Sequence, residues 1–385
     1  MNKKAITILG AIFLLIVGTL VFLIFQRRSA NKNKTTTPNP VVTPTPVTVA
    51  TPLPTGGPTP TPDGGTTVYG SNKAIKLTDE NVVSPVLFYK GNGVAYFTGQ
   101  GQLYQADIDA SSSELKLTNK RELGVPTKSG ITKIYWPAAG NNYIAEMQSS
   151  NGSHAWSVYV SDKGEYVDVP KQVTNFTWTP DGEQLMYLWL DNNKTNLNIA
   201  PPDLATWRVL TDIWENDDAI SMSPDGKTIL FWRTASADAT NNINLVTPDG
   251  KLFRSVVKDG FNSGVVWSPD SQKFAFNKKS ATGFWQLWVG NLSTGEVQNM
   301  NVEAVVDKVV WTSDGKSMYV AAATSGSGEH FLLLDAATGK QQSIDLDSSV
   351  LASDLFLSKD GTKLFFKNNV DGSLYYVDLA TVALN

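Results

Sequence analysis

Cysteine is absent from this 385-residue sequence, and histidine occurs only twice, as His154 and His330. Without cysteine the chain can form no disulfide, no thiolate metal site and no cysteine nucleophile. The two histidines lie four sequence repeats apart, which argues against a shared metal site. No G-x-S-x-G nucleophile motif occurs either. We therefore expect neither a metal nor a cofactor, and we favour a protein that is not an enzyme.

Charged residues are also missing from the run between Ala5 and Phe25, which follows a short tail, 1–4. At about 1.5 Å per residue, a helix of this length can cross a hydrocarbon layer about 30 Å thick. The run continues into QRRSANKNK, with no small-residue cleavage site close behind it. It therefore predicts one transmembrane signal anchor rather than a cleaved signal peptide.

The next residues, 26–70, form a linker that is rich in threonine and proline. Proline removes backbone donors and favours extended polyproline II, so this segment predicts a disordered stalk rather than a core. Positive residues lie on both sides of the apolar run, and their count alone mildly favours a cytoplasmic linker. A stalk up to ~100 Å long instead suits a domain that must clear an envelope layer. We expect a single-pass cell-membrane protein whose main domain, 71–385, lies outside the cytoplasm.

The main domain has an acidic balance of charge. Residues 1–70 carry six Lys and Arg against one Asp, while the whole chain has a net charge of −4. The remainder is therefore strongly acidic, and it contains no basic cluster. Because nucleic-acid binding requires lysine and arginine to neutralise phosphates, we exclude a nucleic-acid partner.

A short pattern recurs through the main domain. The strand–turn–strand segments WTPDGEQLMYLW, SMSPDGKTILFW, WSPDSQKFAFN, WTSDGKSMYVA and LSKDGTKLFFK place aspartates 44, 45, 44 and 46 residues apart, at Asp181, Asp225, Asp270, Asp314 and Asp360. Two weaker copies, VLFYKGNGVAYF and IYWPAAGNNYIAEM, precede them. Alternating apolar residues and turn signals indicate four short strands per unit, and a period near 44 is typical of a β-propeller.

Turn chemistry explains the recurring residues. Proline sets φ for the first corner, aspartate accepts bonds from neighbouring amides, and glycine tolerates positive φ before the second strand. We therefore interpret the five aspartates as structural rather than catalytic or metal-binding. The preceding Trp178, Trp267 and Trp311 occupy one repeat position, where we expect them to pack between blades.

The pattern W-[ST]-P-D-G-x-x-[LIF]-x-[FY] resembles the WD-like repeats of the TolB family of propellers and of the propeller domains in prolyl oligopeptidase-type proteins. The resemblance covers about 80–385, with Ser271 and Ser313 replacing Gly and Pro in two turns. It implies a propeller fold and a binding role. The resemblance implies no catalytic residues, because the sequence has no catalytic nucleophile motif.

Seven units fit the length of the domain. The last unit supplies three strands, and the segment 72–78 stands alone before the first full unit. We expect this segment to complete the last blade, because ring closure removes an exposed sheet edge. Six blades with an irregular N-terminal segment is the alternative.

The function that we favour is a non-catalytic module or scaffold that binds an envelope protein or glycan. The alternative is a glycan-active hydrolase or lyase that uses loop carboxylates. Loops after the second strand of each unit are rich in Asn and Ser, and they share a propeller face with the loops between units. The candidate binding residues on this face are Trp156, Trp214, Asp217, Asp218, Asn193, Asn242 and Trp285. An equally weighted interpretation is that Asn-rich loops simply turn well.

The predicted topology can be tested with protease on intact cells. Because an extended stalk exposes its backbone, cleavage should fall within 35–66 and release a folded fragment of about the size of 71–385. The products are identified by immunoblotting and by their N-terminal sequence. Protection in intact cells, with cleavage only after lysis, would place the domain inside the cell.

Overall fold

The computed structural model describes residues 72–88, 91–148, 154–192, 194–213, 219–233, 241–251, 253–260, 264–280, 283–323 and 328–379. These residues are mostly in β-strands, with the short 3-10 helix η2 (Val306–Lys308) between two of them. No helix within these ranges is long and apolar enough to cross a membrane. The predicted span from Ala5 to Phe25 and the predicted stalk 26–70 lie outside the described residues.

The strands form seven four-stranded antiparallel sheets, which we number in chain order. Sheets 1 to 3 are β2 (Val82–Phe88), β3 (Gly93–Thr98), β4 (Leu103–Asp109), β5 (Lys116–Glu122); β6 (Ile131–Tyr135), β7 (Tyr143–Gln148), β8 (His154–Val160), β9 (Glu165–Asp168); and β10 (Val173–Trp178), β11 (Leu185–Asp191), β12 (Lys194–Ala200), β13 (Arg208–Ile213). Sheets 4 and 5 are β14 (Ala219–Met222), β15 (Ile229–Trp232), β16 (Asn241–Val246), β17 (Phe253–Gly260); and β18 (Val265–Trp267), β19 (Lys273–Lys279), β20 (Trp285–Asn291), β21 (Val297–Glu303). Sheets 6 and 7 are β22 (Val309–Trp311), β23 (Ser317–Ala323), β24 (Glu329–Asp335), β25 (Gln341–Ile344); and β26 (Ala352–Leu357), β27 (Lys363–Asn368), β28 (Ser373–Asp378), β1 (Ile75–Lys76).

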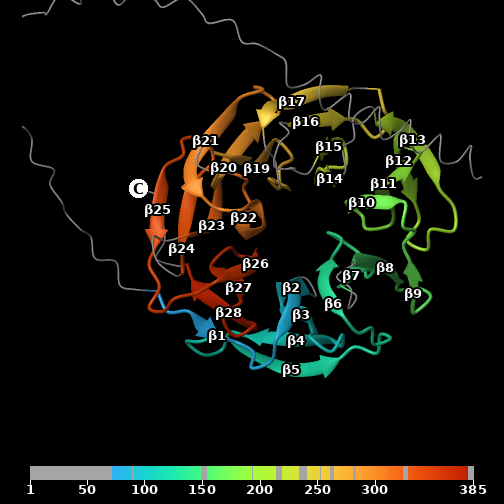
Figure 1. The fold of residues 1–385 in the computed structure, drawn as a ribbon. Helices are drawn as coiled ribbons and strands as arrows, with labels where there is room; N and C mark the ends of the chain where they lie inside the picture. Colours follow the sequence, from blue (N-terminus) through green and yellow to red (C-terminus); the bar gives the residue numbers. More distant parts are fainter. Residues whose placement is uncertain are drawn as a thin grey trace, which may run out of the picture. The chain divides into compact units, whose positions relative to one another are not determined.

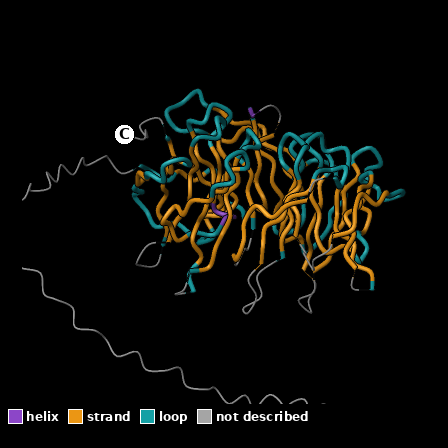
Figure 2. The backbone as a smooth tube through the Cα atoms, turned by 90° about the horizontal axis from the view of Figure 1, so that it is seen from above, coloured by secondary structure: helices purple, strands orange, loops and turns teal. Residues whose placement is uncertain are grey.

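The seven sheets follow one another around a central axis as the blades of a β-propeller. Figure 1 shows the first strand of the sheets, such as β2, β10 and β22, nearest the axis, and the fourth strand at the rim. Figure 2 shows the strands running between two opposite faces, where the loops lie. The predicted all-β, seven-bladed propeller is confirmed, and the alternative of six blades is wrong.

The core lies between neighbouring sheets. Every residue of β3 and of β15 is buried, because both faces of a middle strand are covered by the adjacent blades. The buried apolar residues of the described chain group into seven clusters, one at each junction between blades. At about 25 cal/mol per Å² of buried apolar surface, these junctions provide the main stabilising free energy of the ring.

A tryptophan at the end of the first strand, or directly after it, connects successive blades. Its indole Nε1 donates to a backbone carbonyl in the first strand of the preceding blade. The four instances are Trp136 to Ser84 (2.8 Å), Trp178 to Tyr135 (3.0 Å), Trp267 to Ser221 (3.4 Å) and Trp311 to Val266 (3.2 Å). The expected packing between blades is therefore accompanied by a directional bond that fixes the rotation of one blade on the next.

The recurring turns carry the hydrogen bonds that their residue types predict. In the fourth blade Asp225 accepts from the Ser223 hydroxyl (2.7 Å) and from the backbone amide of Lys227 (3.1 Å). Burial would raise the pKa of Asp225, but these bonds outweigh it and hold the pKa below its ordinary value. Asp181, Asp270, Asp314 and Asp360 make the same pair of contacts.

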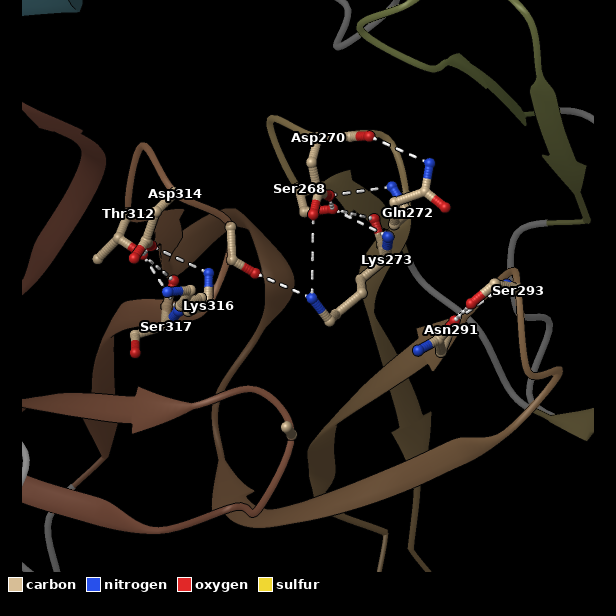
Figure 3. A network of polar contacts seen from close by, with 12 residues as sticks. Ser268, Asp270, Gln272, Lys273, Asn291, Ser293, Thr312, Asp314, Lys316 and Ser317 are labelled. Atoms are coloured by element: carbon tan, nitrogen blue, oxygen red, sulfur yellow. Dashed lines mark hydrogen bonds and ion pairs between the residues drawn. The ribbon is translucent and has the colours of Figure 1, made fainter.

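Neighbouring turns also contact one another. Ser271 stands where other turns have glycine and keeps the left-handed backbone, with φ of 60°. Its hydroxyl accepts from the amide of Asp225 in the preceding blade at 3.0 Å, which no glycine could do. Figure 3 shows the next contact, in which the Lys273 ammonium reaches the carbonyl of Gly315 at 3.2 Å. Hydrogen bonds thus link the turns of blades 4, 5 and 6 on one face of the propeller.

The ring is closed by a strand from the beginning of the domain. β1 pairs with β28, with Ile75 opposite Tyr376 and Lys76 opposite Tyr375. The Leu77 amide donates to the carbonyl of Leu374 (2.8 Å), and the Leu374 amide donates to the hydroxyl of Thr78 (2.9 Å). The seventh blade therefore takes its outer strand from the segment 72–78.

Deletion of 72–78 should destabilise the ring, because β28 would become an unpaired edge strand. We expect the melting temperature to fall by ~5 °C or more, with self-association visible in light scattering. An unchanged melting temperature and a monodisperse monomer would contradict this role for β1.

The Asp225→Ala variant should lose about 1–2 kcal/mol of the free energy of unfolding, because it removes the acceptor of two turn hydrogen bonds. Since the pKa of Asp225 is depressed in the folded state, its contribution is present above the unfolded pKa and is lost as the pH falls through the folded pKa. Denaturant titrations at pH 7 and pH 3 measure both effects, and the variant should differ less from the parent at pH 3. Asp162→Ala, an exposed turn carboxylate, is the control. Equal losses in the two variants would contradict the anchoring role.

Candidate binding face and its pocket

The two faces of the propeller differ in the loops that they carry. Because the strands of each blade are antiparallel, the loops after the second and fourth strands leave from one face, which we call the candidate binding face. The turns that contain the five aspartates lie after the first strand, on the opposite face. The aspartates thus lie away from the face where binding is expected.

A pocket of about 210 Å³ opens on the candidate binding face between blades 5 and 6. Blade 5 contributes Phe284 and Trp285, which end the loop between β19 and β20, and Glu303 at the end of β21. Trp285 is half-buried, whereas the Phe284 side chain is 57% exposed at the mouth. A volume of this size accepts roughly one apolar side chain or ring rather than a drug-sized ligand.

The loop that carries the two aromatic residues is held by its own backbone. The amide of Ser280 donates to the carbonyl of Phe284 at 2.8 Å, and the amide of Phe284 donates to the hydroxyl of Ser280 at 3.2 Å. Gly283 has φ of 89°, which a residue with a side chain rarely adopts. The ammonium of Lys279 lies 5.9 Å from the centre of the Trp285 ring. These contacts fix the direction of the aromatic pair.

An ion pair borders the pocket on the side of blade 6. Lys308, from η2, bonds to Glu329, whose side chain is only 8% exposed. The second carboxylate oxygen of Glu329 accepts from the amide of Ala352 in blade 7 at 2.7 Å. Because the carboxylate is already shared by an ammonium and an amide, its role is to join blades 6 and 7. The exposed Glu303 carboxylate is the acidic group that remains accessible at this pocket.

The other predicted binding residues are placed differently. Trp156 lies within β8 and packs against the cluster between blades 2 and 3, with its ring centre 5.4 Å from that of Phe176. Trp156 is half-buried, as Trp285 is, and its role in binding stays a prediction. Asn242 lies in β16, partly buried. The remaining predicted residues, Asn193, Trp214, Asp217 and Asp218, lie outside the described residues.

The two histidines lie in different blades, as the repeat count predicts. Nδ1 of His154, in blade 2, lies 2.6 Å from Glu146, which also accepts from the hydroxyl of Tyr135 at 2.6 Å. Burial, and then the Glu146 charge, raise the pKa of the Tyr135 hydroxyl well above its ordinary value. His330 lies in blade 6. Over the described ranges, no three His, Asp or Glu side chains are grouped so that they could hold a metal ion.

Neither a protein-family model nor a curated protein matches the sequence. Among solved structures, an oligogalacturonate lyase from Vibrio parahaemolyticus is 13% identical, with a TM-score of 0.55 over 80% of this chain and 92% of that chain. An oligogalacturonate lyase in complex with manganese is 12% identical, with a TM-score of 0.57 over 80% of this chain and 91% of that one. TolB from Acinetobacter baumannii is 18% identical over 74% of this chain and 78% of that chain, with a TM-score of 0.43. The two lyases support the propeller fold and nothing further, and the TolB likeness is too small to carry an argument.

Proposed function

We propose that this protein is a membrane-anchored propeller that binds an envelope protein through the pocket between blades 5 and 6. The observation that carries the proposal is the aromatic pair at the mouth of that pocket, the exposed Phe284 and the half-buried Trp285. Aromatic side chains that are rigidly held and partly exposed are typical of the residues that dominate binding free energy at protein interfaces.

The chemistry of the pocket favours a protein segment over a glycan. Ala304, Val305, Ala321 and Ala323 form an apolar wall, and Glu303 provides a negative rim. A single apolar side chain with a neighbouring Lys or Arg would complement both features. A sugar ring would require several convergent hydrogen-bonding groups, whereas Lys308 and Glu329 already bond to each other.

The location is part of the proposal. An apolar run long enough to span a bilayer, followed by a Thr/Pro-rich linker, supports an anchored domain held away from the membrane surface. In that arrangement the propeller presents its loops to partners in the cell envelope. Glu303 is the one carboxylate of the described pocket lining that stays accessible, whereas glycan hydrolysis uses a pair, and this favours binding over that reaction.

Affinity capture from membranes with the full-length protein tests this function. Phe284→Ala and Trp285→Ala should each weaken retention of a reproducible protein partner by tenfold or more, since a buried aromatic anchor contributes about 2 kcal/mol or more. Glu303→Gln should reduce the association rate and its dependence on salt.

Trp207→Ala is the matched control, because Trp207 is 67% exposed and precedes β13 at the rim of blade 3. It should retain the partner, and all four variants should keep the parental melting temperature. Retention only on envelope glycan, or equal effects of Trp207→Ala and Trp285→Ala, would contradict the proposed pocket. Unfolding of Trp285→Ala would show instead that this side chain belongs to the core.

A further inference from the structure

A second and larger cavity, of about 530 Å³, lies along the central axis. It is lined by the first strands of blades 2 to 5, together with Asp307 of η2. Its volume falls in the range of small-molecule sites, about 300–1,000 Å³. None of the residues that line it belongs to the pocket between blades 5 and 6, so any ligand here is independent of the proposed function.

The wall of this cavity is not symmetric around the ring. The first strands of blades 2 and 3 contain register shifts, between Ile131 and Lys133 and between Val173 and Asn175, whereas those of blades 4 and 5 are regular. Such bulges redirect side chains, and here Lys133 and Asn175 follow them directly and line the cavity.

The opposite part of the wall carries small residues. Blade 5 presents Gly264, where a Cβ would lie 2.7 Å from a methyl carbon of Val306, the first residue of η2. Glycine at this position therefore allows η2 to pack closely and to place the exposed Asp307 at the cavity. This side of the cavity therefore has free space and one carboxylate, that of Asp307.

The polar side chains of blade 3 face the cavity with their acceptors already used. The Asn175 carbonyl oxygen accepts from the amides of Phe176 (3.0 Å) and Ile220 (3.4 Å). The Thr177 hydroxyl oxygen accepts from the amide of Met222 at 3.2 Å. Each side chain still has a hydrogen-bond donor. In Asn175 it is the amide NH₂ group, and in Thr177 it is the hydroxyl hydrogen.

Lys133 and Trp232 line the same cavity. Lys133 forms no ion pair within 4 Å in the described chain, and its ammonium lies 5.0 Å from the centre of the Tyr135 ring. Asp354 is a competing carboxylate, but burial dominates its raised pKa, and Lys367 offsets that more than Lys133 does. Because the indole Nε1 of Trp232 is buried from solvent, the exposed Lys133 is the donor of this pair that a ligand can reach.

We propose that the axial cavity binds a small zwitterion, a free amino acid or short peptide. The ligand carboxylate accepts from Lys133, Asn175 and Thr177, and its ammonium faces Asp307. A cationic donor together with two neutral donors suits a carboxylate, which binds more strongly to charged than to neutral donors. The opposite charges of Lys133 and Asp307 select a ligand that carries both signs over a simple anion.

Isothermal titration of the full-length protein with alanyl-alanine tests the proposal. Its C-terminal amide and its N-acetyl derivative, each lacking one charge, are the matched ligands. We expect saturable binding of the dipeptide and at least tenfold weaker binding of both derivatives. Free alanine in the same assay distinguishes an amino-acid site from a peptide site. No saturable heat with either alanine or the dipeptide at millimolar concentration, or equal binding of the amide, would overturn the proposal.

Two substitutions of Lys133 and one of Asp307 test how the ligand is oriented. Lys133→Met should weaken dipeptide binding by about tenfold or more, whereas Lys133→Arg, which keeps the charge, should retain it. Asp307→Asn should abolish the preference for the free over the acetylated amino group. Lys227→Met, whose side chain is 81% exposed in a turn, should change nothing. Unaltered binding in Lys133→Met, at an unchanged melting temperature, would exclude this orientation of the carboxylate.

Discussion

The structure depends on the burial of both faces of every sheet against its neighbours. A middle strand such as β15 is apolar at every residue, so no blade could expose either face to water. Seven clusters of buried apolar residues satisfy this requirement, and closure of the ring by β1 leaves no blade with an open side. The indole bonds of Trp136, Trp178, Trp267 and Trp311 add direction to contacts that are otherwise non-directional.

The contacts that stabilise the ring and the candidate binding pocket also lie on different faces of the propeller. On one face, hydrogen-bonded turns link successive blades, as between Asp225 and Ser271. The pocket beside Phe284 and Trp285 opens on the other face, away from these turns. A repeat protein of this kind can therefore change its loops without disturbing the contacts that hold the ring together.

Along the axis, departures from the repeat create chemical asymmetry. If all seven first strands were equivalent, the central cavity would present the same side chain seven times. Instead, register shifts place Lys133 and Asn175 on one side, while Gly264 leaves space and η2 brings Asp307 to the other. Small irregularities in a regular scaffold thus distinguish one side of the cavity from the other.

The repeat period and the domain length predicted seven blades, and the three strands of the last unit predicted the closing strand. These predictions succeeded because a turn or an alternating strand is a local property that adjacent residues determine. The candidate site was predicted only in part. Trp285, the first residue of β20, was recognised but not its neighbour Phe284, and the binding role of the half-buried Trp156 stays a prediction. The pairing of Lys308 with Glu329, and the convergence of Lys133, Trp232 and Asp307 on one cavity, join residues that are distant in sequence. No local pattern encodes such contacts, since they arise only when the blades pack around a common axis.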